Sequence, residues 1–347
     1  MVPGGACRES IVTPARGAAG SLPQGPRRPD LVNPFMAPLD RLPAVGFIGL
    51  GVMGRPMASH LAAAGHEVHL FDIAPGVADA LAAGLPTARA AASPAAVASA
   101  CPIVVTMVPN GQVVSDLLHG ENGLLRGFSP GALLLDTSSS EPWLTEASGR
   151  ALAAAGVAMV DAPVSGAEWG AKAAELVFMC GGAAADLERV RPLLARMGKE
   201  VFHLGPLGAG HAMKCLNNTI TAMNFLAVAE GLVVGKRYGL DPAAMVDVLD
   251  RSTGMSWISQ THIRQRVLSR SFDDPFKLAL MVKDIGIAME LGRTTGVPTP
   301  LSSLGQALWQ AAAAGAAPDA SVSELARWVE RATGTEITPG SGDPAPR

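Results

Sequence analysis

From residue 44 onward, short apolar runs alternate with longer alanine-rich segments of helical pattern. Short apolar runs bounded by turn residues predict buried strands, and the alanine-rich segments between the first several of them predict helices. The predicted strands are residues 45–48, 68–71, 103–106, 133–136, 158–160 and 176–180. Repeated strand–helix units predict an α/β domain with a doubly wound, mainly parallel sheet and helices on both faces.

The strand pattern stops at about residue 205, and a long, largely apolar segment runs from Gly208 to about residue 234. This segment predicts one long helix. Gly239 predicts a helix stop, and Asp241-Pro242 predicts the N-cap and first turn of the next helix. Ser321 and Glu324 have the spacing of a capping box, which predicts a further helix start. The second half of the chain is therefore expected to be all-helical and to be entered through the long helix.

The two ends of the chain lack such a pattern. Residues 1–42 are rich in Pro, Gly, Ala and Arg, and we expect a disordered extension. They lack the apolar stretch of a secretory signal, and their prolines and glycines oppose the amphipathic helix of a transit peptide. The expected organisation is an α/β domain at 43–205, a helical domain at 206–334 and a disordered tail at 335–347.

Composition narrows the classes of function. The 347-residue chain is 48% hydrophobic and 16% charged, with a net charge of −3. No basic cluster favours nucleic acid or an anionic membrane, and Asn224, Glu230 or prolines interrupt the most apolar segments, so none is expected to span a bilayer. Scattered cysteines without metal-ligand spacing predict no metal site; reduced thiols in a cytoplasmic protein are favoured over disulfides. These cysteines are Cys7, Cys101, Cys180 and Cys215.

A glycine-rich loop follows the first predicted strand, with the spacing G-x-G-x-x-G, and a predicted helix follows the loop. Gly49 permits a tight turn, Gly51 lets the backbone approach a pyrophosphate, and Gly54 permits close packing of helix on strand. The helix N-terminus then faces the phosphates. The residues expected to bind a dinucleotide here are Gly49, Leu50, Gly51, Val52, Met53 and Gly54.

The second predicted strand ends in Asp72, about 20 residues further along. An acidic side chain at this place accepts hydrogen bonds from a ribose diol and repels a 2′-phosphate. No arginine follows directly, so the sequence favours NAD over NADP. The alternative is a glycine-rich turn beside a solvated aspartate.

Polar and turn residues also follow the strands that end at Thr106 and Asp136. Doubly wound sheets bind ligands at the carboxyl ends of their strands. Both segments could equally be strand-to-helix turns capped by Asn110 or Ser, and the sequence leaves that open.

The long predicted helix carries a lysine near its start. Lys214 and Asn218 are four residues apart and share a face, with Asn217 one position round. Burying an unpaired ammonium is costly, so Lys214 must reach water or line a cleft. A lysine in a cleft beside an amide is suited to proton transfer at a hydroxyl or carbonyl oxygen. The alternative is a solvated lysine near a helix start.

Four motifs together resemble those of the β-hydroxyacid dehydrogenase family, which includes 3-hydroxyisobutyrate dehydrogenase. The resemblance covers about residues 44–332, in the order of the family. The motifs are the glycine-rich loop at 46–54 continuing to Pro56-Met-Ala58, Asp161-Ala-Pro-Val-Ser-Gly166, Gly208-x-Gly210 with Lys214-x-x-Asn217-Asn218, and Phe276-x-Leu-x-Leu-Met-x-Lys283-Asp284.

The resemblance implies a Rossmann domain, a long interdomain helix and an all-α domain, with the active site between them. It implies a small 3-hydroxy acid as substrate, a homodimer or homotetramer, and Lys214 as the general acid/base. Ser165, Gly166 and Ala167 match the loop that holds the substrate carboxylate, and Asn218 the residue that helps to hold substrate. Residues matching further cofactor contacts are Val108, Pro109, Ser139 and Lys283.

The chain departs from the family pattern after Ser165. The family usually has Ser-Gly-Gly where this chain has Ser165-Gly166-Ala167, and Glu168 and Trp169 add charge and bulk. Ala174-Glu175 replaces the usual Gly-Thr or similar. These departures leave the identity of the hydroxy acid open.

Several alternatives remain at the level of sequence. An imine reductase-like relative is one, although that branch usually lacks the lysine, and a non-catalytic dinucleotide-binding sensor is another. His211 is expected to be non-catalytic, because the family motif tolerates other residues there. Lys283 could serve only to pair with Asp284, and Ser165 could be a loop residue. Arg264, Arg266 and Arg270 suggest a basic helix face, which is usually solvated.

Overall fold

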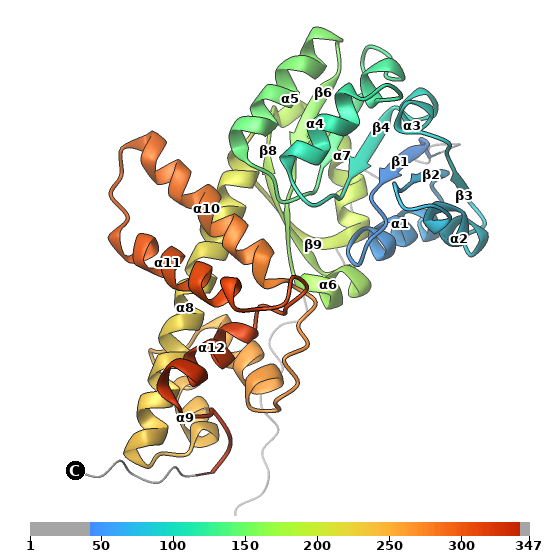
Figure 1. The fold of residues 1–347 in the computed structure, drawn as a ribbon. Helices are drawn as coiled ribbons and strands as arrows, with labels where there is room; N and C mark the ends of the chain where they lie inside the picture. Colours follow the sequence, from blue (N-terminus) through green and yellow to red (C-terminus); the bar gives the residue numbers. More distant parts are fainter. Residues whose placement is uncertain (1–41, 341–347) are drawn as a thin grey trace, which may run out of the picture. The chain divides into compact units, whose positions relative to one another are not determined.

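The computed structural model describes residues 42–340, so most of the expected extension and the end of the expected tail lie outside the described residues. Residues 45–205 form an α/β half (Figure 1). Its elements are β1 (Val45–Ile48), α1 (Gly54–Ala63), β2 (Val68–Phe71), α2 (Val77–Ala83), β3 (Ala88–Ala90), α3 (Pro94–Ala100), β4 (Ile103–Thr106), α4 (Gly111–His119), η1 (Leu124–Arg126), β5 (Leu133–Asp136), α5 (Pro142–Ala154), β6 (Ala158–Asp161), β7 (Val164–Ser165), α6 (Ala167–Ala173), β8 (Leu176–Gly181), α7 (Ala184–Met197) and β9 (Gly198–Gly205).

The strands form one sheet in the order β3-β2-β1-β4-β5-β6-β8-β7, with β9 also paired to β8. The pairs from β3 to β6 are parallel, and β8 runs antiparallel to β6 and β7. All six predicted strands are confirmed, as is the doubly wound arrangement. Three strands were not predicted: β3 and β7 are very short, and β9 is largely exposed and polar, so none gives an apolar run.

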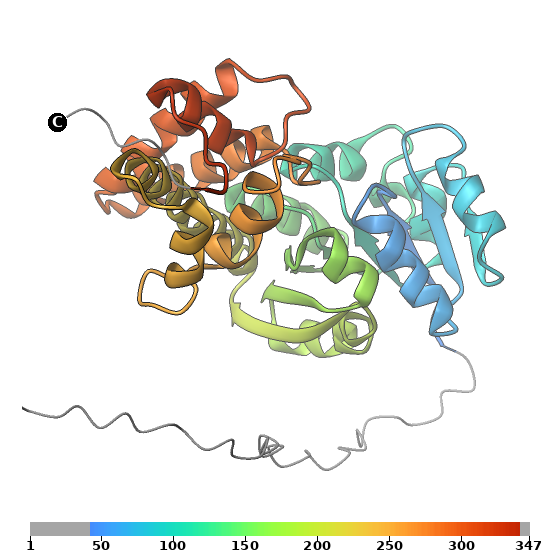
Figure 2. The ribbon, with the colours of Figure 1, turned by 90° about the horizontal axis from the view of Figure 1, so that it is seen from below.

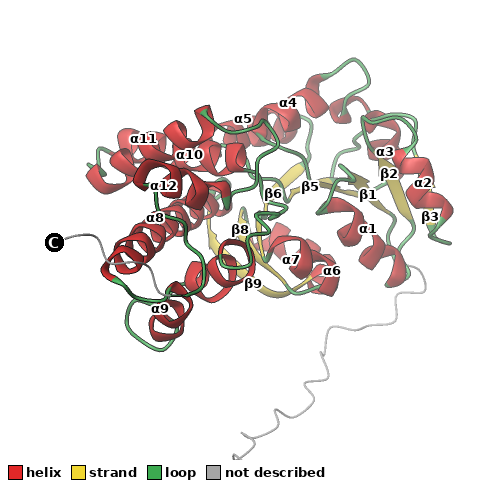
Figure 3. Ribbon diagram, turned by 60° about the horizontal axis from the view of Figure 1, so that its bottom comes forward, coloured by secondary structure: helices red, strands yellow, loops and turns green. Residues whose placement is uncertain are grey.

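Successive residues of the central strands point to opposite faces of the sheet, and both faces are covered (Figure 3). Phe47, Leu70 and Leu135 pack on one face with α1 and α7 residues. Val104 and Leu134 pack on the other with residues of α3, α4 and α5. This burial on both faces explains why the strands are continuously apolar.

Residues 209–333 form a helical half. The helices are α8 (Ala209–Tyr238), α9 (Pro242–Leu249), η2 (Ser259–Val267, a π-helix), α10 (Leu278–Thr295), α11 (Pro300–Ala314) and α12 (Glu324–Thr333). They enclose a second apolar core, in which the fully buried Trp309 donates a hydrogen bond from its indole nitrogen to the Ala222 carbonyl at 3.3 Å. Figure 2 shows α8 from another side, running through this half.

The helix-end predictions had mixed outcomes. Gly239 ends α8 with φ 102°, and the Asp241 carboxylate accepts a hydrogen bond from the Ala243 N–H, so both are confirmed. The predicted capping box at Ser321 and Glu324 is not formed, so that prediction is wrong. Helix α12 begins at Glu324, and Ser321 instead accepts the N–H of Ser323 within the preceding turn.

One helix in the described part of the chain, α8, is long and apolar enough to cross a membrane by length and composition alone, with a mean hydropathy of 1.2 in its most apolar window. The expectation that no segment would meet this criterion is therefore wrong. Of that window 56% is buried in the protein, as in core helices of soluble proteins, which pass the same test.

The prediction of a disordered tail is also wrong for its beginning, residues 335–340. Residues 335–340 lack regular structure but pack on the helical half. Ile337 is buried, and its N–H donates to Glu330 at 2.7 Å, while Lys236 donates to the Thr338 carbonyl at 2.8 Å. The sequence contains no periodicity here because these contacts are made by single residues.

The cysteines that can be described are buried and free, as predicted. Burial raises the pKa of Cys101, Cys180 and Cys215 to about 12 in each case, so their thiolates are scarce near neutral pH. Cys7 lies outside the described residues.

The start of α8 lies so close to β8 that a side chain cannot be added. A Cβ on Gly210 would collide with the Met179 carbonyl oxygen and come within 2.8 Å of Asp161 Oδ2. We predict that Gly210→Ala lowers the free energy of unfolding by about 2–4 kcal/mol. Gly286→Ala in α10, whose Cβ would meet only Gln306 at 3.7 Å, serves as the control and is expected to add about 0.5–1 kcal/mol. Urea unfolding measures both, and equal effects would contradict the close contact.

Candidate active site

The loop after β1 has the geometry that its glycines predict. Gly49 has φ 94°, and a Cβ there would collide with the Met107 carbonyl oxygen. A Cβ on Gly54 would collide with the Gly49 carbonyl, whereas one on Gly51 would meet nothing within 4 Å. Two glycines thus shape the turn, and the third leaves open space above the backbone for a ligand.

Asp72 lies beside this loop. Its carboxylate accepts the Leu50 N–H at 2.7 Å and the Ala74 N–H at 2.8 Å, so its position is fixed relative to both loop and strand end. No acidic residue occupies the first turn of α1. Free N–H groups at a helix start, open space at Gly51 and an acceptor at the end of β2 fit a dinucleotide.

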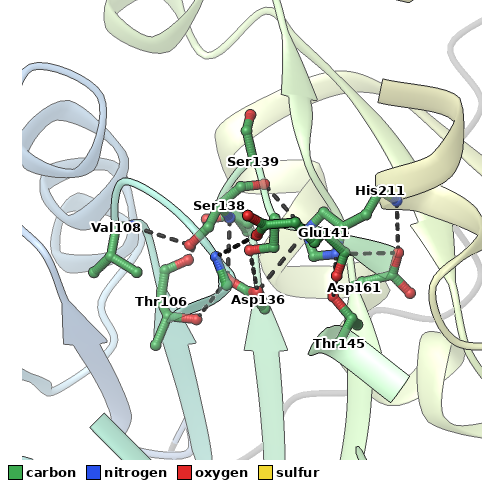
Figure 4. A network of polar contacts seen from close by, with 12 residues as sticks. Thr106, Val108, Asp136, Ser138, Ser139, Glu141, Thr145, Asp161 and His211 are labelled. Carbon is green, nitrogen blue, oxygen red and sulfur yellow. Dashed lines mark hydrogen bonds and ion pairs between the residues drawn. The ribbon is translucent and has the colours of Figure 1, made fainter. Parts of the chain in front are cut away.

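A buried network ties together the ends of β4 and β5 (Figure 4). Asp136 is fully buried and accepts hydrogen bonds from the Thr106 hydroxyl at 2.9 Å and the Ser138 N–H at 3.1 Å. The Val108 N–H donates to the Ser138 hydroxyl at 3.0 Å. The two strand-end loops therefore have one fixed spacing, with Pro109 exposed and Ser139 half-buried at the surface of the network.

A second carboxylate joins the sheet to α8. Asp161, at the end of β6, is fully buried and accepts the N–H groups of Gly208 and His211, each at 2.8 Å. These donors belong to the first turn of α8, where backbone N–H groups lack partners within the helix and the helix dipole favours an anion. Asp161 therefore fixes the start of the helix that carries Lys214.

His211 is enclosed by this network and is 1% exposed. Its Nε2 lies 3.2 Å from the Ser138 carbonyl and its Nδ1 lies 2.7 Å from the Thr145 hydroxyl (Figure 4). Because a carbonyl oxygen only accepts, Nε2 carries a proton and donates it. Both nitrogens have protein partners, which fits the expectation that His211 is non-catalytic.

Helix α10 reaches back to the strand ends through Lys283. Its ammonium donates to the carbonyl oxygens of Ser139 and, at 3.2 Å, Pro109, and it lies 3.2 Å from Asp284 Oδ1. The pairing with Asp284 is thus present, but so are the contacts with both predicted cofactor loops. Lys283 holds the helical half against the edge of the sheet where the dinucleotide is expected.

Asp284 is the polar residue that sequence reasoning left without a role of its own. It is 1% exposed and accepts a hydrogen bond from the Asn218 side chain at 2.6 Å. Asn217 donates in turn to Asn218 at 3.2 Å. Its place beside Lys283 in a shared motif was the only signal in the sequence, because the partners lie 66 residues apart.

Lys214 differs from Lys283 in having no fixed partner. Its side chain is half-buried, and its ammonium makes no hydrogen bond or ion pair with any residue between 42 and 340. Removal from water lowers the pKa of Lys214; the nearby Asp284 carboxylate raises it and the Lys283 ammonium lowers it, and the net pKa lies below the ordinary value. Among the described residues Lys214 is thus unpaired. Its surroundings increase the fraction of its side chain that is in the neutral amine form near neutral pH.

The predicted substrate loop begins on β7, the strand next to β8. Ser165 on β7 pairs with Val177 of β8, and Gly210 of α8 packs on Met179 of the same strand. Lys214 lies one helical turn beyond Gly210 on the same face of α8. Gly166 has φ 130° and Ala167 has φ 52°, so Ala167 occupies the left-handed region that glycine adopts without strain.

The basic residues of η2, and Arg270 just after it, are paired with acids. Arg264 donates to Asp247 at 2.8 Å, Arg266 to Asp273 at 2.8 Å, and Arg270 to Glu330 Oε2 at 3.0 Å. They therefore form structural ion pairs on the helical half. In the described part of the chain no group of three or more His, Cys, Asp or Glu side chains is placed to hold a metal ion.

Similarity to known proteins identifies the family. Residues 44–205 match the family model of the NAD-binding domain of 6-phosphogluconate dehydrogenase. Residues 208–329 match that described as NAD-binding of NADP-dependent 3-hydroxyisobutyrate dehydrogenase. A 2-(hydroxymethyl)glutarate dehydrogenase of Eubacterium barkeri is 34% identical over 296 residues, which cover 85% of this chain and 98% of the relative. The chain belongs to the β-hydroxyacid dehydrogenase family.

Two further relatives agree with this membership. An NAD-dependent L-serine dehydrogenase of Pseudomonas aeruginosa is 37% identical over 272 residues, covering 77% of this chain and 91% of the relative. A structure of Mycobacterium tuberculosis 3-hydroxyisobutyrate dehydrogenase with L-serine has a TM-score of 0.76 and 33% identity, covering 83% of this chain and 99% of that one. As a β-hydroxyacid dehydrogenase, the protein is an oxidoreductase that uses a nicotinamide dinucleotide.

Proposed function

We propose that the protein interconverts a small 3-hydroxy acid and its semialdehyde or keto acid, with Lys214 as the general acid/base. The observation that carries this proposal is the unpaired, half-buried Lys214 ammonium beside a closed Asn218–Asp284–Lys283 cluster. Lys283 links the cluster to Ser139 and Pro109 in the expected cofactor loops. Dehydrogenase activity on hydroxy acids in relatives at 34–37% identity supports the same reaction class.

Different residues of the chain are proposed to have different roles in this reaction. The bound nicotinamide accepts or supplies the hydride. Lys214 in its neutral form takes the hydroxyl proton during oxidation, and in its charged form returns a proton during reduction. Its lowered pKa makes the neutral form accessible nearer to neutral pH. Asn218 is oriented by Asp284, and Ser165 and Gly166 are proposed to hold the substrate carboxylate.

We propose NAD rather than NADP as the cofactor. The support is Asp72, a carboxylate held in place by two backbone N–H groups at the end of β2. A 2′-phosphate at that position would meet a fixed negative charge.

Replacing Asp72 tests this choice. Asp72→Asn retains the shape of the side chain but removes its charge, so we predict that the kcat/KM preference for NAD over NADP falls by about tenfold or more. Asp79→Asn, on the exposed face of α2 in the same region, is the control. An unchanged preference in Asp72→Asn would assign cofactor choice to other residues.

The catalytic role of Lys214 is tested by Lys214→Ala. We predict a loss of kcat of about 10²–10⁴, the usual contribution of a general acid/base, with cofactor binding retained. Lys199→Ala, which removes an exposed lysine of β9, is the matched control. The assay follows NADH formation with a panel of small hydroxy acids, including hydroxyisobutyrate and glycerate, with NADP in parallel.

The same panel separates the alternatives. Cofactor binding without turnover of any hydroxy acid would favour a sensor, and turnover of cyclic imines alone would favour an imine reductase. Near-wild-type turnover in a folded Lys214→Ala protein would remove Lys214 from the mechanism while leaving the family membership intact.

The pH profile of oxidation reports the protonation of Lys214. Because the neutral lysine is the base, kcat/KM should rise with pH and level off at a pKa below the ordinary lysine value. Lys283→Gln removes a positive neighbour, so the pKa of Lys214 and the rising limb should move to higher pH. Asp284→Asn removes a negative neighbour and should move the limb to lower pH. Shifts in the same direction, or none, would show that another group titrates.

We also propose that two or more copies associate through the helical half. Val234, Tyr238 and Leu301 are 70%, 75% and 69% exposed, and a mostly apolar groove of about 570 Å³ runs between α8 and α9. Exposed apolar area of this kind is typical of protein–protein interfaces.

Light scattering tests the association. We predict a mass of at least twice the 35.5 kDa of one chain, and a fall toward one chain in Val248→Glu, which places a charge in the groove. Val52→Glu, at an exposed apolar residue of the other half, is the control for added charge. A wild-type protein with the mass of one chain would contradict the proposal.

A further inference from the structure

Two tryptophans stack on each other between the α/β half and the helical half. The rings of Trp169 and Trp257 have centroids 6.2 Å apart and are inclined by only 16°, the geometry of an offset stack. Trp169 belongs to α6, and Trp257 lies two residues before the start of η2. Each residue is about half exposed, at 49% and 51%, so the pair lies at the surface and outside both apolar cores.

Trp169 lies next to the proposed substrate loop. Helix α6 starts at Ala167, and the Gly170 N–H donates to the Gly166 carbonyl at 2.9 Å. Trp169 therefore lies in the first turn of α6, three residues beyond Gly166, the N-cap of that helix. A bulky ring at this position borders the site where Ser165 and Gly166 are proposed to hold the carboxylate.

Helix α6 is fixed to the domain that carries the cofactor loop. His60 of α1 has its Nε2 3.0 Å from the Ala171 carbonyl and 3.2 Å from the Lys172 carbonyl of α6. Trp169 is thus presented by a short helix that is tied to α1. In Figures 1 and 2, α6 lies on the side of the sheet nearest the helical half.

Trp257 is fixed independently from the other side. Ser256 and Ser259, which flank it, exchange hydrogen bonds between their hydroxyls and each other's N–H groups at 3.1 and 3.2 Å. The next residue, Ile258, is 1% exposed, and the Thr261 hydroxyl donates to the Trp257 carbonyl at 2.7 Å. The exposed indole is therefore held by a rigid, buried turn, which is what a wall of a binding site requires.

We propose that the Trp169–Trp257 stack closes one side of the substrate site and limits the size of the substituent on the substrate carbon next to the carboxylate. This inference rests on the proposed function, because it concerns the same hydroxy acid. The stack joins α6, next to the proposed carboxylate loop, to the helical half, so a large substituent would have to displace one of the two rings.

The first arm of the test detects the stack without activity. Two stacked indoles couple their electronic transitions and give an exciton couplet in the far-ultraviolet circular dichroism spectrum. We expect this couplet in the wild type, its loss in Trp169→Ala and in Trp257→Ala, and no further change in the double variant. Trp143→Ala, which removes a tryptophan 38% exposed on α5, should keep it. Thermal melts check that each variant is folded.

The second arm measures kcat/KM for 3-hydroxy acids with hydrogen, methyl, ethyl and benzyl at carbon 2. We expect the wild type and Trp143→Ala to discriminate steeply against the larger groups. Trp169→Ala should reduce that discrimination by roughly tenfold or more, the scale on which pockets distinguish small apolar groups, with an unchanged KM for the cofactor.

The outcomes separate the two proposals. Turnover with the same size discrimination in Trp169→Ala and wild type would overturn the stack's role and leave the proposed function standing. No turnover of any hydroxy acid by the wild type would overturn the function and the specificity role together. Absence of the couplet in the wild type would overturn the stack itself.

Discussion

The position of α8 depends on one buried carboxylate. Asp161 ends β6 and accepts two backbone N–H groups from the first turn of α8, at a helix end where a negative charge is favoured. A buried charge is costly unless it is fully hydrogen-bonded, so this contact specifies one arrangement of the helix on the sheet. Gly181 and Gly210 allow it, because a Cβ at either would approach the Asp161 carboxylate. Lys214, Asn218 and the cluster around them follow from that single placement.

The site contains two lysines with contrasting surroundings. Lys283 is tied to two carbonyl oxygens and a carboxylate, so its position is fixed. Lys214 has none of these partners among the residues described, and both desolvation and the fixed charge of Lys283 lower its pKa. One lysine thus acts as part of the scaffold, and the other is left able to exchange a proton. The Asp284 carboxylate, 3.2 Å from the Lys283 ammonium, offsets part of this positive charge and opposes the lowering of the pKa of Lys214.

The sequence predicted the parts of this protein that are governed by local pattern. The central parallel strands are buried on both faces and therefore continuously apolar, and Gly49, Gly54 and Gly239 occupy backbone positions that glycine suits. Strands β3 and β9 were missed because they are short or exposed. Ser321 was assigned as a cap because a cap spacing also occurs in turns. The roles of Asp161 and Asp284, and the meeting of Trp169 with Trp257, depend on partners 47 to 88 residues away, which no local pattern encodes.

The length of α8 gives the Asp161 anchor a mechanical consequence. Thirty residues make a rod of about 45 Å, and Val234 lies about 30 Å beyond Lys214 along it. A tilt of the rod by one degree about its anchored end would carry the far end through about 0.8 Å. Lys214 lies about one turn from the anchor and would move by less than a fifth of that. Lys214 therefore lies near the pivot of this lever, where a tilt that displaces the far end of the helix is least felt.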